Sequence, residues 1–350
     1  MDNSFFVFTN KPDNLVIERF HICTWEFNNN TSLVEFGFEI SRESFREKEN
    51  LAISLFVPWL TKECRTKDLY EKLKIADNSR FIFNDSINRT DSFDGGRNKL
   101  GVVHVFNDRA PLCIQPIDIE THDKIINIKT DLKIYNNYNF RSYPNIYFRF
   151  WIQPKIPFVS MRKNGINKST IIYDIKVNEK RNIPENQVSF FNTVNFCKIN
   201  SCFSFNIIPN KYDIVFFENV TLKNVRTLEY ESFNKYLGDR RVKKDELIVV
   251  FNKKQNSESF SFFSIFSNER IGTGQFALAL LINIICGIIL FVPSFRKSFS
   301  PELSLFQVWY KFPIEIYIAI GIIFLVIIYF LWPKLSYPFV KLINKFKQYF

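Results

Sequence analysis

The stretch Gln275–Val292 reads QFALALLINIICGIILFV and carries no charged residue. A second stretch, Ile316–Trp332, reads IYIAIGIIFLVIIYFLW and is also uncharged. An α-helix needs about 20 apolar residues to cross the hydrocarbon core of a bilayer, with a usual range of about 17–25. Both stretches lie near the short end of this range. They favour a C-terminal hairpin of two transmembrane helices, over 271–293 and 315–332, rather than two buried helices of a soluble protein.

The segments beside the two spans are predicted to lie at the membrane surface. Pro293 and Pro333 are expected to end the two helices, because proline interrupts the helical hydrogen bonds. Residues 294–314 then form an interfacial loop. Residues 333–350 form an amphipathic basic tail, whose apolar residues recur near helical spacing as in a helix lying along a bilayer. The tail lysines expected at lipid head groups are Lys341, Lys345 and Lys347.

The orientation of the spans follows from the N-terminus and from the basic residues near the membrane. The N-terminus begins MDNSFFVFTN and has no basic region before an apolar run, so it does not resemble a secretory signal. More Lys and Arg residues flank the spans on the side of the N-terminal domain and the tail than in the connecting loop. We therefore expect a membrane protein with two spans and with both termini in the cytoplasm.

Residues 1–251 are predicted to form a cytosolic, mainly β domain, built as a sandwich or barrel of antiparallel strands. In the segment 34–40, apolar residues alternate with Glu35, Gly37 and Glu39. This period of two predicts a strand with one face in the core and one face in water. Similar short strands recur along the domain, including Phe81–Phe83, whereas helix is expected only at 66–75 and 231–237.

Two further boundaries are predicted from composition. The segment 136–144, NNYNFRSYP, is a candidate boundary between two smaller β units. The segment 252–270 begins with Asn, Lys and Ser residues, and we expect it to be a linker into the membrane.

One strand carries residues that could support catalysis. Asp118, Glu120 and His122 alternate with isoleucines, so they share one face of a predicted strand. Two carboxylates and an imidazole can act as an acid–base set or bind a metal. The ordinary interpretation is the solvated face of an edge strand, and we favour it. The alternative function is a membrane-bound hydrolase or nuclease at these three residues.

The chain is basic, with a formal net charge of +11, which favours anionic partners. A basic run near the end of the β-domain is a candidate site for a ligand or for lipid head groups; it comprises Arg240, Arg241, Lys243 and Lys244. The six cysteines show no pairing or zinc-type spacing, so reduced structural thiols are expected. No metal and no cofactor is predicted, and nucleic acid stays open as a partner.

Within the first span, Asn283 is the one strongly polar side chain. A buried amide seeks a hydrogen-bond partner on another helix, and small residues such as Gly287 and Gly321 allow helices to approach closely. These three residues are predicted to pack the spans together or to join copies of the protein as a homo-oligomer.

The layout predicts a membrane-anchored, non-enzymatic protein. The β-domain would bind a cytosolic ligand or protein and couple this binding to the two-helix hairpin in the lipid bilayer. A specific form of this hypothesis is an oligomerising effector of prokaryotic defence that perturbs the membrane when the domain is engaged.

Overall fold

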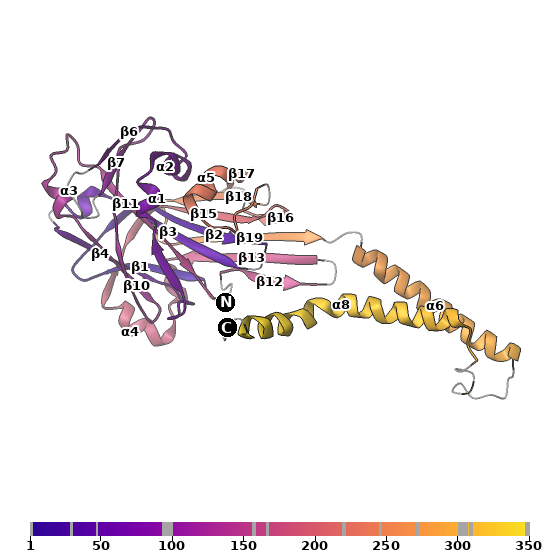
Figure 1. The fold of residues 1–350 in the computed structure, drawn as a ribbon. Helices are drawn as coiled ribbons and strands as arrows, with labels where there is room; N and C mark the ends of the chain where they lie inside the picture. The colour runs from indigo at the N-terminus through magenta and orange to yellow at the C-terminus, as the bar shows by residue number, and fades with distance from the viewer. Residues whose placement is uncertain are drawn as a thin grey trace. The chain divides into compact units, whose positions relative to one another are not determined.

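The computed structural model describes residues 3–28, 31–46, 48–92, 101–155, 159–165, 168–218, 222–244, 247–269, 273–299, 307 and 311–346. The chain divides into two compact units (Figure 1). The first comprises Met1–Arg162 and Thr170–Ser267, and the second comprises Lys163–Ser169 and Asn268–Phe350.

The first unit is mainly β, as the alternating segments predict, and contains two large sheets. The first sheet has nine strands in the order β16-β19-β13-β1-β4-β10-β9, with β12 beside β13 and β14 beside β1. Its strands are β1 (Ser4–Asn10), β4 (Asn50–Phe56), β9 (Asp118–His122), β10 (Ile125–Asp131), β12 (Met161–Asn164), β13 (Lys168–Val177), β14 (Val194–Phe196), β16 (Asp213–Phe217) and β19 (Phe260–Glu269).

The second sheet has ten strands in the order β17-β18-β15-β2-β3-β11-β8-β7-β6, with β5 beside β11. Its strands are β2 (Val16–Glu26), β3 (Ser32–Ile40), β5 (Arg65–Asp68), β6 (Ile87–Ser92), β7 (Val102–Phe106), β8 (Leu112–Ile114), β11 (Asn145–Gln153), β15 (Lys198–Pro209), β17 (Leu222–Thr227) and β18 (Leu247–Gln255).

Both sheets are mixed, so the predicted antiparallel arrangement holds for most strand pairs but not for all of them. β1 runs parallel to β13, β2 runs parallel to β15, and β8 runs parallel to β11. Parallel neighbours need long crossover connections, and here those connections consist largely of other strands of the sandwich. The central strand β2 therefore pairs with a strand from the far end of the domain, which alternation within either strand does not reveal.

The main hydrophobic core lies between the two sheets. On β3 the apolar face, Val34, Phe36, Phe38 and Ile40, is completely buried in this core. Residues of the first sheet such as Tyr173 complete it from the other side. Burial of so many aromatic and branched side chains is the dominant stabilising contribution, at about 25 cal/mol per Å² of apolar surface.

Helices cover the outer faces of both sheets. Short helices α1 (Tyr70–Leu73), α2 (Ala76–Phe83) and α5 (Tyr230–Leu237) bury a second apolar cluster against the outer face of the ten-stranded sheet (Figure 1). Helix α4 (Val188–Phe191) covers part of the outer face of the nine-stranded sheet. Helix α3 (Lys133–Asn137) overlaps the start of the segment 136–144, which leads into β11 inside the first unit.

The helix expected at 231–237 is confirmed as α5, whereas the strand expected at Phe81–Phe83 is the end of α2. Ser79 Oγ donates a hydrogen bond to the carbonyl of Leu73, at 2.5 Å, which ties this helix to the turn before it. Phe83 packs edge-on against Tyr147. The aromatic residues that suggested a strand are therefore buried from a helix instead.

The segment 252–270 is not a linker. Its first residues complete β18, and Phe260–Glu269 form β19. Phe260, Phe262 and Phe266 point into the core between the sheets, and burial of these rings outweighs the polar composition that suggested a linker.

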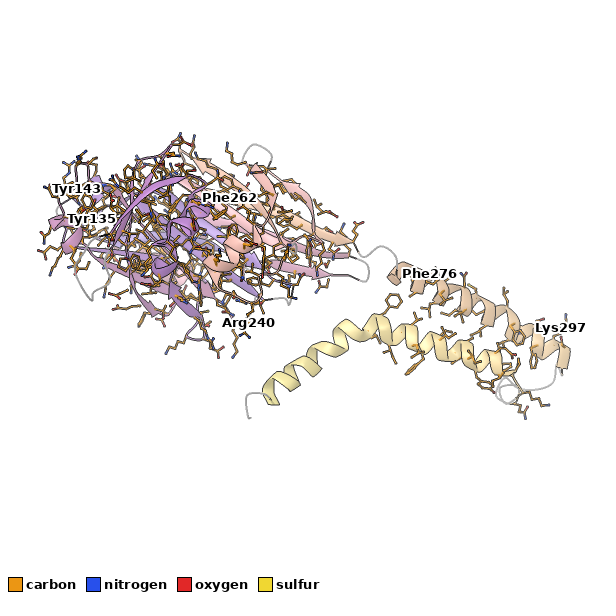
Figure 2. All side chains as sticks on the ribbon, turned by 45° about the horizontal axis from the view of Figure 1, so that its top comes forward. Tyr135, Tyr143, Arg240, Phe262, Phe276 and Lys297 are labelled. Carbon is orange, nitrogen blue, oxygen red and sulfur yellow. The ribbon has the colours of Figure 1, made fainter. Side chains whose placement is uncertain are left out.

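The second unit contains two long helices, α6 (Thr273–Phe299) and α8 (Ile314–Phe346), which lie side by side (Figures 1 and 2). Phe276–Phe295 of α6 is long and apolar enough to cross a membrane, with a mean hydropathy of 2.7. The described apolar part of α8, Ile314–Ile328, is shorter than this. Pro293 and Pro333 lie within the two helices and do not end them, because apolar helices continue through proline where local adjustments satisfy the freed carbonyl.

Candidate ligand-binding site

The outer face of the ten-stranded sheet carries buried charges beneath α1, α2 and α5. Glu35 on β3 and Arg149 on β11 point away from the central core and form an ion pair at 2.5 Å. Their side chains are 0% and 3% exposed. The Glu35 carboxylate also accepts hydrogen bonds from Trp25 Nε1 at 3.0 Å and from Tyr236 Oη at 2.9 Å. The face of β3 predicted to be solvated is therefore enclosed.

Burial and the ion pair act in opposite directions on Arg149. Burial is the largest single influence and lowers the pKa of the guanidinium, but Glu35 together with Tyr236, Tyr147 and Cys23 outweighs it, so the pKa is raised well above its usual value. The charged pair is thus a fixed part of the floor of this site.

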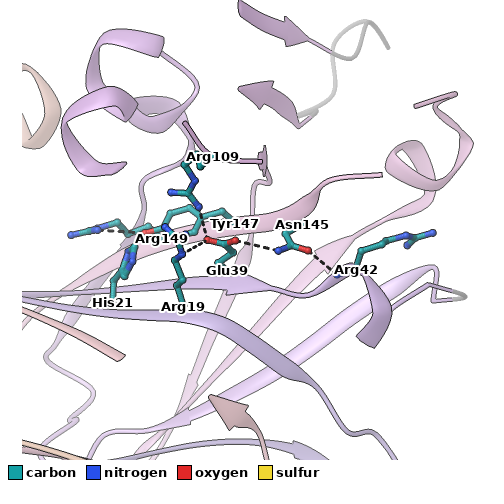
Figure 3. Close-up of polar contacts among 8 residues, drawn as sticks. All are labelled: Arg19, His21, Glu39, Arg42, Arg109, Asn145, Tyr147 and Arg149. Atoms are coloured by element: carbon teal, nitrogen blue, oxygen red, sulfur yellow. Dashed lines mark hydrogen bonds and ion pairs between the residues drawn. The ribbon is translucent and has the colours of Figure 1, made fainter. Parts of the chain in front are cut away.

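Tyr147 and His21 extend the buried network along the sheet. Arg149 Nη1 lies 3.4 Å from Tyr147 Oη, which lies 3.0 Å from His21 Nδ1 (Figure 3). Burial, followed by the positive charge of Arg149, lowers the pKa of His21 well below its usual value, so this imidazole is neutral at pH 7.

Gly37 provides the space for the Tyr147 ring. A Cβ atom at position 37 would lie 2.1 Å from Tyr147 Oη and 2.9 Å from Tyr147 Cζ. Since real Cβ atoms do not approach other atoms this closely, any side chain at Gly37 would displace the tyrosine.

A second carboxylate holds two more arginines beside this network. Glu39 Oε2 lies 2.6 Å from Arg109 Nη2 and 3.6 Å from Arg19 Nε (Figure 3). Its other oxygen accepts a hydrogen bond from Asn145 Nδ2 at 3.2 Å. Arg109 also lies over the rings of Phe83 and Phe106, at 4.9 and 5.0 Å from their centroids. One carboxylate is shared between two guanidinium groups, which leaves positive charge at this end of the site.

A cavity of about 310 Å³ opens above this floor. Its basic residues are Arg19, Arg109, Arg149, Lys223 and Arg226. Among the described residues that line it, none is acidic. Cationic side chains in a partly enclosed site recognise anions, and arginine in particular binds phosphate or carboxylate through paired N–H groups.

The walls of the cavity are aromatic. On the sheet, Phe205 and Phe251 are cross-strand partners whose rings stack at 4.7 Å with an interplanar angle of 8°. Phe203 continues the stack, at 5.9 Å and 4° from Phe251. Phe81 and Phe233 line the cavity from α2 and α5. A ligand here would meet cations on some sides and aromatic side chains on others.

Two potential catalytic groups in this cavity are held in unreactive forms. Burial, together with the negative charge of Glu35, raises the pKa of the Cys23 thiol well above its usual value, so the thiol is protonated. His21 is neutral and hydrogen-bonded to Tyr147. The arrangement therefore suits binding of an anion and offers no activated nucleophile at Cys23.

A second, more open cavity of about 630 Å³ adjoins the first at Lys223, which lines both. It is lined by Lys253, by Lys254, which pairs with Glu218 of the same lining at 2.6 Å, and by serines that include Ser257. Lys253 Nζ lies 5.5 Å from the centroid of Phe203, one of the aromatic walls of the first cavity. Basic residues therefore continue outward from the aromatic cavity along β17 and β18.

The predicted catalytic residues lie elsewhere, on β9 at the edge of the nine-stranded sheet. Asp118, Glu120 and His122 are all exposed. Glu120 pairs with Lys129 at 3.0 Å, and His122 lies 3.2 Å from Asp123. In the described part of the chain, no group of three His, Cys, Asp or Glu side chains is placed to hold a metal ion.

The predicted basic run follows α5 but does not line the cavity. Arg241 pairs with Asp239 at 2.6 Å and lies 4.3 Å from the centroid of Phe27. It joins the turn after α5 to the sheet. The other three members are exposed; they are Arg240, Lys243 and Lys244.

The predicted membrane residues are placed as follows. Asn283 on α6 is exposed, and a Cβ atom at Gly287 or Gly321 would meet no described atom within 4 Å, so neither glycine marks a close helix contact within this chain. Lys341 and Lys345 belong to α8, but their side chains lie outside the described residues. Lys347 lies outside them entirely.

Sequence reasoning missed the cavity, although the sequence contains a sign of it. Charged residues interrupt two strongly apolar strands, Glu35 in SLVEFGFEI and Arg149 in NIYFRFWIQ. Opposite charges inside two such strands indicate a buried pair, since a charge is buried only when paired. A comparison of the chain with protein-family models and with curated proteins finds no match.

Proposed function

We propose that this chain is a membrane-anchored binding protein whose β-domain takes a small anionic ligand. The observation that carries the proposal is the cavity beneath α2 and α5. Five cationic side chains and several aromatic side chains line it, and none of the described lining residues is acidic. Concave sites with apolar walls and a few convergent polar groups are the usual form of small-molecule sites. The volume of about 310 Å³ suits a ligand of metabolite size.

The membrane anchor is the second part of the proposal. Phe276–Phe295 of α6 has the length and hydropathy of a span, and its side chains are largely exposed in the chain by itself. Helix α8 would supply the second span. More Lys and Arg residues flank the spans on the side of the β-domain and the tail than in the connecting loop, which favours a cytoplasmic β-domain. Under this topology the cavity would sample cytosolic ligands.

Titration with inorganic pyrophosphate tests the anion site in the full-length protein in detergent micelles. A ligand that binds only the folded state stabilises it, by about 2.7 kcal/mol at 100 times Kd. We expect pyrophosphate to raise the Tm. The double variant Lys223→Ala/Arg226→Ala should lose most of this increase, because both cations line the cavity. Arg181→Ala is the matched control, since Arg181 is exposed and pairs with Glu179 away from the cavity.

Two results would contradict the proposal. The first is an unchanged Tm of the wild-type protein at millimolar pyrophosphate. The second is an increase in Tm that the double variant retains in full.

The expected homo-oligomer and the membrane-perturbing effector remain predictions. Expression with a membrane-potential dye tests the effector, because the wild-type chain should depolarise cells and a chain with a charged residue in α6 should not. The hydrolase or nuclease alternative also remains a prediction. Unchanged cellular function after alanine replacement of Asp118, Glu120 and His122 would argue against it.

A further inference from the structure

The aromatic walls of the cavity favour an anion that carries a planar ring over a bare inorganic anion. A bare inorganic anion is bound by cations and N–H groups and gains nothing from contact with aromatic rings. Here the stacked rings of Phe203, Phe205 and Phe251 line the cavity from the sheet, and Phe81 lines it from α2. Aromatic rings of this kind bind planar π systems by stacking.

The cations are divided between the floor and the open side. Arg149 and Arg109 are nearly buried and pair with Glu35 and Glu39. In contrast, Lys223 is exposed and forms no ion pair within the described part of the chain. Charged oxygens of a ligand would therefore gain most on the open side, at Lys223.

The neighbouring residues extend this positive side. Arg226 lies 3.6 Å from Glu229, a loose ion pair that leaves its guanidinium able to bind a second anion. Lys253 lines the adjoining cavity beyond Lys223, whereas Lys254 of that cavity pairs with Glu218 at 2.6 Å. Phosphates leaving the aromatic cavity would thus meet Lys223 and then Lys253.

Two amides complete the site. Asn84, the left-handed residue that directly follows α2, and Asn224, on β17, both line the aromatic cavity. An asparagine amide both donates and accepts, which matches the hydrogen-bonding edge of a nucleobase.

We infer that the ligand of this cavity is a nucleotide, with its base between the phenylalanines of the sheet and α2 and its phosphate at Lys223 and Arg226. The inference rests on the proposed anion site and adds the identity of the ligand class. The cavity of about 310 Å³ lies at the small end of ligand sites, which suits one base, and the adjoining cavity takes the phosphates or a linked nucleotide.

The test compares AMP, GMP, CMP and UMP with ribose 5-phosphate by calorimetric titration of the full-length protein in micelles. We expect at least one nucleotide to bind roughly tenfold or more tightly than ribose 5-phosphate, because base stacking on aromatic side chains has about this value. Phe205→Leu and, independently, Phe251→Leu should reduce this preference severalfold. Phe263→Leu is the control, since Phe263 is 39% exposed and lies outside the cavity.

The outcomes separate the two proposals. If all four nucleotides bind no more tightly than ribose 5-phosphate, the nucleotide inference is wrong and the anion site stands. If neither the nucleotides nor ribose 5-phosphate nor pyrophosphate binds, both are wrong. A preference for nucleotides that survives in both leucine variants, with their Tm unchanged, also overturns the proposed position of the base.

Discussion

Replacing Glu35 by glutamine should destabilise the β-domain strongly. The substitution keeps the shape of the side chain but removes the charge that offsets Arg149, whose side chain is 3% exposed. It also places an N–H₂ group among donors from Trp25, Arg149 and Tyr236. Breaking a buried ion pair by removing one partner costs about 3–5 kcal/mol, which is a large part of the roughly 5–15 kcal/mol that stabilises a typical domain.

Thermal unfolding of the full-length protein in micelles measures this loss. A change of about 3–5 kcal/mol corresponds to a fall in Tm of roughly 6–20 °C for a domain of this size. Glu120→Gln is the matched control. It removes a carboxylate paired with Lys129 on the exposed edge strand, and such pairs contribute about 0–1 kcal/mol.

A double variant separates the loss of the pair from the loss of packing. Glu35→Leu combined with Arg149→Met should recover much of the stability, because apolar residues of similar volume often replace a buried ion pair without cost. A Glu35→Gln protein whose unfolding free energy stays within about 1 kcal/mol of wild type would refute the argument that this pair is enclosed by the helices.

Three further predictions concern the same fold. His21 has a lowered pKa in the folded state, so only the unfolded state gains a proton at this residue as the pH falls below about 6.5. The contribution of His21 to the unfolding free energy should therefore fall by up to about 1.4 kcal/mol per pH unit. In unfolding measured from pH 7 to 5, His21→Gln should make this dependence on pH less steep. Gly37→Ala should cost about 1–3 kcal/mol by displacing Tyr147, and it should also weaken ligand binding; an unchanged Tm would contradict the close contact. Ile285→Lys places a charge near the middle of the apolar segment Phe276–Phe295 of α6, which costs about 3 kcal/mol of insertion free energy. The variant should therefore leave the membrane fraction that resists extraction with carbonate. Full retention in that fraction would argue against the span.

The sequence predicted the β class and the position of several strands because alternation is a local property. On β3 the apolar face was predicted correctly, and Phe36 and Phe38 are completely buried. The opposite face was predicted to be wet, yet Glu35 is completely buried. Its partners Arg149 and Tyr236 lie 114 and 201 residues further along the chain, so local periodicity contains no information about the cover on that face.

The errors near the membrane have a similar cause. The segment 252–270 begins with polar residues, which suggested a linker. Three phenylalanines of β19 are nevertheless buried in the core, against strands that are far away in the sequence. The helix ends were misplaced because proline was expected to interrupt both helices, whereas α6 and α8 continue through Pro293 and Pro333. The cavity was missed because its lining comes from seven elements far apart in the sequence, which are β2, α2, β11, β15, β17, α5 and β18.

The pairing of β2 with β15 has a consequence for synthesis on the ribosome. Thr24 and Asn206 are partners across these strands, 182 residues apart. At about 5–20 residues per second, the edge of β2 waits roughly 10–35 s for its neighbour to be translated. Throughout that interval the unpaired edge of β2 is open to pairing with other nascent chains, so the risk of misassembly lasts until the last third of the domain emerges.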